Sequence, residues 1–186
     1  MKVLVLGGVK SGKSRYVENR LKACIEQQLC TDRQVAVIVT GQALDQAMAE
    51  RISKHQQQRP DGWQVIEAPL HLAEAIVAAQ ENAEVIMVDC LTLWLTNLLM
   101  LEDTEKLQQE LDRLLEVVKN SEASLFVVSN ETNMGIMPLG QLTRDYCDHI
   151  GILHQRLAEL ADEVVMVMAG LPLFLKSAPS QGLSVE

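Results

Sequence analysis

Residues 3–14 read Val3-Leu4-Val5-Leu6-Gly7-Gly8-Val9-Lys10-Ser11-Gly12-Lys13-Ser14, and this stretch decides the fold. It satisfies G-x-x-x-x-G-K-[ST], the phosphate-binding P-loop. An apolar run of β-strand character precedes the glycines and a helical pattern follows them, as the motif requires. The backbone N–H groups of such a loop, together with the start of the new helix, bind phosphate oxygens. We therefore expect a nucleoside triphosphate at residues 7–14, with Lys13 facing its β- and γ-phosphates and Ser14 binding Mg²⁺.

The composition is that of one globular domain without a basic surface. The chain has 186 residues, 48% of them hydrophobic, and a formal net charge of −9. This length predicts a single catalytic domain over residues 1–176, with a Ser-, Pro- and Gly-rich tail from 177 to 186 that we expect to fray. The negative charge argues against nucleic-acid and membrane partners. Without C-x-x-C spacing, signal peptide or transmembrane run, the sequence predicts free thiols and a cytoplasmic protein.

Apolar runs of β-strand character alternate with segments of helical periodicity along the chain. This alternation predicts an α/β fold with a mostly parallel central sheet flanked by helices. The predicted strands are 3–6, 35–39, 85–88, 125–129 and 164–168, with a further short strand at 63–66 and an edge strand at 171–176. The predicted helices are 14–28, 45–58, 70–80, 91–101, 104–120 and 142–161. Ligands of such sheets bind beyond the carboxyl ends of the strands, so the residues that follow each strand are the candidates.

Asp89 ends the apolar run Val85-Ile86-Met87-Val88, which gives this segment the form of a Walker B strand. In that role its carboxylate would bind Mg²⁺ beside Ser14. Apolar strands also end in Asp where it caps the next helix, which is the alternative. The P-loop upstream favours the metal role.

Arg51, His55 and Arg59 follow one another at intervals of one helical turn. The spacing alone favours a solvated, polar helix end that Pro60 stops. The functional alternative is attack on phosphorus, because a neutral imidazole is a nucleophile and neighbouring cations would keep it unprotonated while neutralising phosphate charge.

Two further segments have two interpretations each. Residues 129–138 place Ser129, Asn130 and Glu131 after a strand and before a Gly/Pro loop, which suits an active-site rim or an ordinary connection. Residues 91–99 are more apolar than a surface helix, and are core or a subunit contact, with Thr92 and Asn97 as polar ligand candidates. We interpret the remaining histidines, His71, His149 and His154, as structural.

Five segments, taken in order, resemble one family, the bifunctional adenosylcobinamide kinase/adenosylcobinamide-phosphate guanylyltransferases of cobalamin biosynthesis. The resemblance runs over nearly the whole chain, to about residue 176. The matching segments are Gly7 to Ser14, Arg51-Ile52…His55…Arg59-Pro60, Val88-Asp89-Cys90-Leu91-Thr92-Leu93-Trp94-Leu95-Thr96-Asn97-Leu98-Leu99, Val128-Ser129-Asn130-Glu131…Met134-Gly135-Ile136…Pro138, and Gln155-Arg156-Leu157-Ala158…Ala161-Asp162-Glu163-Val164…Ala169-Gly170-Leu171-Pro172-Leu173.

The resemblance implies a RecA-like P-loop fold, a homotrimer and two reactions. The hydroxyl of adenosylcobinamide takes the γ-phosphate of ATP or GTP. GMP from GTP then passes through a guanylyl-histidine to adenosylcobinamide phosphate, with release of pyrophosphate. The family's histidine falls on His55, which becomes the expected nucleophile. By the same comparison the nucleotide would contact Thr40, Gly41, Gln42, Gln56, Gln57, Gln58, Arg59, Glu67 and Asp89.

The chain departs from the family's pattern in three places. Thr132-Asn133 stands where relatives usually have Val-Gly, Gln56-Gln57-Gln58 replaces a more charged run, and His154 stands where Asn is commoner. The first two departures fall on expected ligand contacts and bear on substrate preference. Two other functions compete with the family's: a P-loop small-molecule kinase without the transferase step, and a P-loop switch or assembly ATPase.

Overall fold

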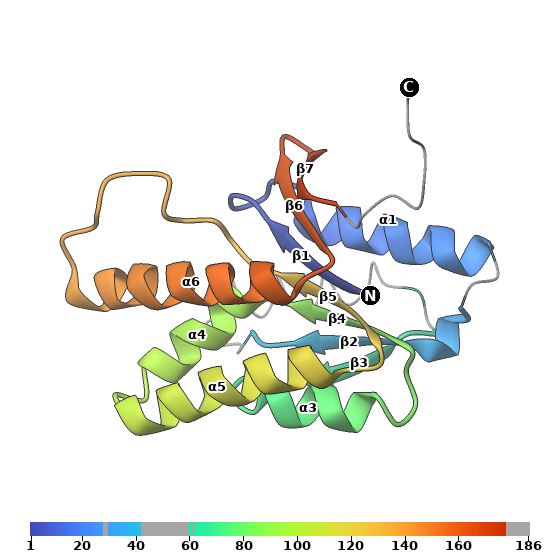
Figure 1. Ribbon diagram of the computed structural model, residues 1–186, viewed down its shortest axis with the longest axis horizontal. Helices are drawn as coiled ribbons and strands as arrows, with labels where there is room; N and C mark the ends of the chain where they lie inside the picture. The colour runs from blue at the N-terminus through green and yellow to red at the C-terminus, as the bar shows by residue number, and fades with distance from the viewer. Residues whose placement is uncertain (28–29, 42–59, 61, 178–186) are drawn as a thin grey trace.

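A computed structural model describes residues 1–27, 30–41, 60 and 62–177 of the chain. These residues build a seven-stranded sheet with the order β3-β2-β4-β5-β1-β6-β7. Neighbouring strands are parallel throughout, except for β6 and β7, which are antiparallel. Helices cover both faces of the sheet (Figure 1). The expected α/β fold with a mostly parallel sheet is confirmed.

The strands lie where the apolar runs predict them, including the short strand and the edge strand. Their bounds are β1 Lys2–Leu6, β2 Val35–Val39, β3 Gln64–Glu67, β4 Val85–Asp89, β5 Ser124–Val128, β6 Glu163–Met168 and β7 Leu171–Lys176.

The helices begin and end within a residue or two of the predicted positions, as is usual for fraying helix ends. Their bounds are α1 Lys13–Glu26, α3 Leu72–Ala79, α4 Leu91–Leu99, α5 Thr104–Asn120 and α6 Gln141–Leu160. A short 3₁₀ helix, η1 (Asp32–Gln34), was not expected, and Thr31 and Gln34 close it with a capping box. The predicted helix 45–58 lies outside the described residues.

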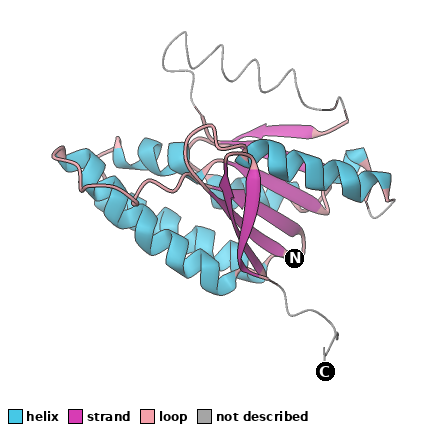
Figure 2. Cartoon of the chain, turned by 90° about the horizontal axis from the view of Figure 1, so that it is seen from above, coloured by secondary structure: helices cyan, strands magenta, loops and turns pink. Residues whose placement is uncertain are grey.

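Two apolar cores, one on each face, follow from the alternation of side chains along the strands. On β1, Val3 and Val5 face α1 and pack with Val17 and Leu21 of that helix. The alternate side chains of β1 face the opposite core, which α3, α4, α5 and α6 cover (Figures 1 and 2). Because both faces are buried, the strands read as nearly continuous apolar runs.

Residues 91–99 belong to the core. Leu91, Trp94, Leu95 and Leu98 of α4 are buried against the sheet. The indole Nε1 of Trp94 donates to the carbonyl of Leu70 at 2.8 Å, which satisfies the polar atom of the buried ring. The core interpretation of this segment is therefore confirmed.

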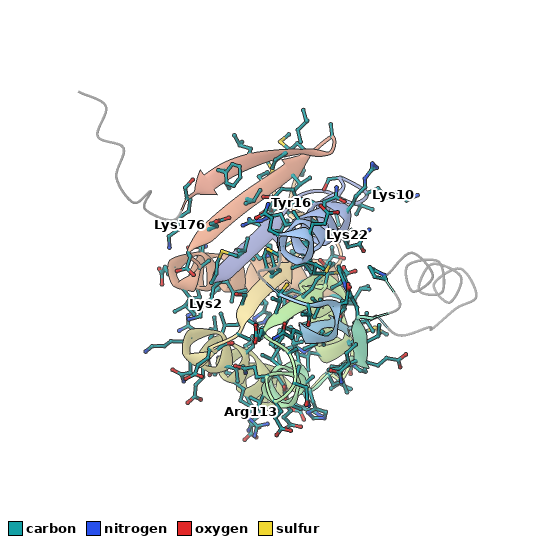
Figure 3. The ribbon with its side chains drawn as sticks, turned by 90° about the vertical axis from the view of Figure 1, so that its right-hand side faces the viewer. Lys2, Lys10, Tyr16, Lys22, Arg113 and Lys176 are labelled. Atoms are coloured by element: carbon teal, nitrogen blue, oxygen red, sulfur yellow. The ribbon has the colours of Figure 1, made fainter. Side chains whose placement is uncertain are left out.

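The edge strand β7 differs from the other strands because every one of its residues is exposed. Lys176 ends this strand and is labelled at the left of Figure 3, whereas Arg113 of α5 lies at the bottom of that view. The four cysteines are free thiols, as predicted. Within the described ranges, none of the helices combines the length and apolar character needed to cross a lipid bilayer.

Candidate active site

The P-loop connects β1 to α1 through backbone conformations that favour glycine. Gly7 has φ +146° and Gly12 has φ +101°. A Cβ on Gly7 would also lie 2.3 Å from the carbonyl oxygen of Val167 in β6, which no side chain can tolerate. The motif's two outer glycines are therefore required by the turn itself.

Lys13 is the first residue of α1, and its side chain folds back into the loop. Its Nζ donates to the carbonyls of Gly7 at 2.8 Å and Gly8 at 2.6 Å, and the residue is buried. The hydroxyl of Ser11, also buried, has no hydrogen-bond partner in the described part of the chain. An ammonium group and an unsatisfied hydroxyl inside the same loop suit a phosphate group.

Ser14 and Asp89 meet although 75 residues separate them in the sequence. The Ser14 hydroxyl lies 3.2 Å from Oδ1 of Asp89, at the carboxyl end of β4. Hydroxyl and carboxylate oxygens form a donor set suited to Mg²⁺. The N-cap residue of α4 is Cys90 and not Asp89, which argues against the capping alternative.

Thr40 follows β2 at the same edge of the sheet and is fully buried. Its hydroxyl donates to the carbonyl of Cys90 at 2.6 Å and accepts from the Cys90 N–H at 3.2 Å. Asn97 of α4 donates to the carbonyls of Thr40 at 2.8 Å and Pro69 at 3.0 Å. These bonds tie the ends of β2 and β4 to α4, so Asn97 braces the site's backbone. Glu67, at the end of β3, is exposed next to β2.

Several residues that the family resemblance places at the nucleotide lie outside the described residues. They are Gln42, Gln56, Gln57, Gln58, Arg59 and the expected nucleophile, His55. Gly41 is described and follows Thr40 directly.

The segment after β5 lies against the P-loop. The N–H of Glu131 donates to the Gly7 carbonyl at 3.0 Å, and the N–H of Ser129 donates to Val5 at 3.0 Å. Between them, the N–H of Asn130 donates to the hydroxyl of Thr92 at 2.9 Å. These contacts place residues 129–131 between the P-loop and α4.

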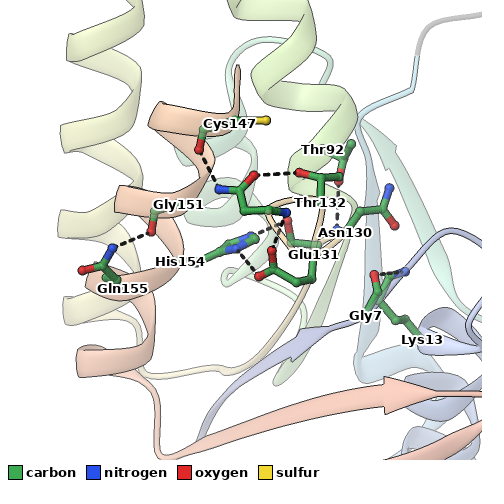
Figure 4. Close-up of polar contacts among 12 residues, drawn as sticks. Gly7, Lys13, Thr92, Asn130, Glu131, Thr132, Cys147, Gly151, His154 and Gln155 are labelled. Carbon is green, nitrogen blue, oxygen red and sulfur yellow. Dashed lines mark hydrogen bonds and ion pairs between the residues drawn. The ribbon is translucent and has the colours of Figure 1, made fainter. Parts of the chain in front are cut away.

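His154, interpreted from sequence as structural only, faces this segment from α6 (Figure 4). It is buried, with Nε2 2.7 Å from the Ser129 hydroxyl and Nδ1 3.6 Å from Oε2 of Glu131. Burial lowers the pKa of His154, and the Glu131 carboxylate opposes part of that shift. The sequence signal for this contact is the exchange of the family's commoner Asn for His154.

The hydroxyl of Ser14 faces a carboxylate at the end of β4, and β5 lies between β4 and β1, the strand that leads into the P-loop. This arrangement defines a P-loop nucleotide-binding protein of the RecA-like class. Residues 3–175 match the family described as cobinamide kinase/cobinamide phosphate guanyltransferase. The chain belongs to this family.

Three curated relatives resemble the chain over nearly its full length. A protein named bifunctional adenosylcobalamin biosynthesis protein CobP, from Pseudomonas aeruginosa, is 45% identical over 179 residues, which cover 96% of this chain and 99% of the relative. Proteins named bifunctional adenosylcobalamin biosynthesis protein CobU are 34% identical in Escherichia coli and 35% identical in Salmonella typhimurium. Each alignment covers 95% of this chain and 100% of the relative.

Proposed function

We propose that this protein phosphorylates adenosylcobinamide with ATP or GTP and then transfers GMP from GTP to adenosylcobinamide phosphate. Family membership supports both activities. The observation that carries the kinase step is the convergence of the buried Lys13 with the Ser14–Asp89 pair at one edge of the sheet.

In the kinase step, the P-loop backbone and Lys13 would hold the triphosphate with its γ-phosphorus toward the acceptor. The hydroxyl oxygen of the cobinamide bonds to the γ-phosphorus, the bond to the β–γ bridging oxygen breaks, and the nucleoside diphosphate leaves while the hydroxyl proton is released. Such a reaction needs positioning and charge neutralisation more than covalent chemistry. Ser14 and Asp89 would hold Mg²⁺, which neutralises phosphate charge when bound.

In the transferase step, the imidazole of His55 would attack the α-phosphorus of GTP. The new P–N bond replaces the bond to the bridging oxygen, and pyrophosphate leaves. A phosphate oxygen of adenosylcobinamide phosphate then attacks the same phosphorus, the P–N bond to His55 breaks, and adenosylcobinamide-GDP is formed. Thr40, Gly41, Gln42, Glu67 and the segment 56–59 would contact the nucleotide, as the family resemblance implies.

The decisive experiment is the intact mass of the protein after incubation with GTP and Mg²⁺. We expect one added GMP per chain, stable in base and lost in acid, as a P–N bond requires. His55→Ala should gain no mass and should still phosphorylate adenosylcobinamide, whereas the control His149→Ala should behave as wild type. If the wild-type protein phosphorylates adenosylcobinamide but gains no GMP, the transferase step is excluded. If His55→Ala still gains GMP, the nucleophile is another residue.

We further propose that residues 1–176 act as one catalytic domain in the cytoplasm and assemble as a homotrimer. The support for assembly is the apolar edge strand, in which Leu171, Leu173 and Leu175 are 71%, 55% and 57% exposed. Exposed apolar edges of this kind favour association. Sedimentation equilibrium should give three times the chain mass of 20.6 kDa. Leu173→Lys should reduce that mass, whereas Val77→Lys, on the exposed side of α3, should not. Equal masses for the two variants would exclude β7 as the surface through which the chains assemble.

A further inference from the structure

The residues that follow β5 divide between the two faces of the sheet. Phe126 and Val128 face α1, and Leu125 and Val127 face the core under α6. The N–H of Ser129 donates to Val5 of β1 and the N–H of Glu131 donates to Gly7, just after β1, so the pairing continues beyond the end of β5. The alternation therefore continues, with Asn130 on the face of α1 and the P-loop.

Asp89 occupies the equivalent face of the neighbouring strand. It pairs with Val128, two residues before Asn130, and its own strand places Val85 and Met87 against α1. Asn130 thus lies on the same face as the metal-site carboxylate, one step further beyond the strand ends, where the distal phosphate of a nucleotide held by the P-loop would lie.

The side-chain amide of Asn130 is available for a ligand. Its backbone N–H donates to the hydroxyl of Thr92, whereas its side-chain amide makes no hydrogen bond within the described ranges. The residue is half-buried. Figure 4 shows the Asn130 side chain on the side of Gly7 and Lys13, away from His154.

The opposite face holds this segment in place. His154 contacts both residues that flank Asn130, with Nε2 at 2.7 Å from the Ser129 hydroxyl and Nδ1 at 3.6 Å from Oε2 of Glu131. The other carboxylate oxygen of Glu131 accepts from the N–H of Asn133 at 2.8 Å. One buried side chain of α6 therefore fixes the backbone on both sides of Asn130.

We propose that Asn130 donates a hydrogen bond to the γ-phosphate in the kinase step, and that His154 is the positioning residue that presents it. The inference rests on the proposed kinase function, and concerns the phosphate that is transferred. A donor at the γ-phosphate stabilises the charge that spreads over its oxygens during transfer. Lys13 would bind the same phosphates from within the P-loop.

Asn130→Ala and Asn130→Asp test the contact through binding of a non-hydrolysable triphosphate and of the diphosphate. We expect Asn130→Ala to lose about tenfold or more in triphosphate affinity, and a similar factor in kcat, because a hydrogen bond to a charged group is lost. Diphosphate affinity should not change, which also shows that the variant is folded. Asn130→Asp, of nearly the same shape, should lose more because its carboxylate repels phosphate.

His154→Leu tests the positioning role. We expect it to reduce the preference for triphosphate over diphosphate, and His154→Asn to restore it, while the control His149→Leu on the same helix leaves it unchanged. An unaltered preference in Asn130→Ala would overturn the contact, provided the wild-type protein is an active kinase. If the wild type does not phosphorylate adenosylcobinamide at all, the proposed function itself fails. A normal preference in His154→Leu would remove His154 from the proposal.

Discussion

Lys13→Met separates the binding role of Lys13 from its structural role. The buried ammonium group bonds to the carbonyls of Gly7 and Gly8. Methionine keeps the length of the side chain and removes the charge. The Gly7 carbonyl still accepts from the Glu131 N–H, and Gly8 is exposed to water. We therefore expect a change of about 1 kcal/mol in the free energy of unfolding, or about 2–4 °C in Tm.

The effect on nucleotide binding should be larger. Charge-assisted hydrogen bonds contribute about 1.5–3 kcal/mol each, so losing one contact to the β-phosphate and one to the γ-phosphate corresponds to a loss of affinity of about 100-fold or more. Isothermal titration with a non-hydrolysable triphosphate and Mg²⁺ measures this loss. Lys22→Met, an exposed lysine of the same helix, is the matched control. Wild-type affinity in Lys13→Met, or an equal loss in both variants, would refute the phosphate role of Lys13.

Three further predictions follow from contacts around the site. Asp89→Asn keeps the size of the side chain beside Ser14 and removes its charge, so the Mg²⁺ concentration needed for half-maximal kinase activity should rise more than the nucleotide Kd; an unchanged Mg²⁺ titration would contradict the metal role. Asn97→Ala leaves the carbonyls of Thr40 and Pro69 without a donor and should destabilise the protein by about 2–3 kcal/mol in urea unfolding, whereas the exposed Asn120→Ala should have no such effect. Burial lowers the pKa of His154 below 6.5, so the unfolded chain binds a proton more readily and this part of the stability is lost as the pH falls below 6.5; the free energy of unfolding of His154→Asn should fall less steeply there.

The features that could be predicted from the sequence are those that depend on local patterns. The P-loop is a continuous motif whose glycines, lysine and serine each have a local chemical reason, and the apolar runs predict the strands because both faces of the sheet are buried. The contact between Ser14 and Asp89 could be expected because parallel strands bring their carboxyl ends to one edge.

The strand order could not be predicted from local sequence patterns. The insertion of β5 between β1 and β4 is a non-local pairing, and no periodicity along the chain encodes which strands are neighbours. The contact of His154 with Ser129 depends on that order, because α6 must cross the end of β5 for the two side chains to meet. The bond between the Thr40 hydroxyl and Cys90 likewise could not be predicted, because it forms only where β2 and β4 are adjacent.

Two departures from the family's pattern, far apart in the sequence, meet around Glu131. The backbone N–H of Asn133 would donate to Glu131 whatever the side chain, so the usual glycine would keep that bond. What Asn133 adds is a side-chain bond to the carbonyl of Cys147 in α6 at 2.8 Å. Gly151 leaves room for it, because a Cβ there would lie 3.0 Å from the Asn133 amide nitrogen. His154 contacts the same glutamate from the same helix. The two exchanges thus both strengthen the attachment of the loop after β5 to α6, and we interpret them as coupled changes that hold Glu131 and its neighbours beside the P-loop.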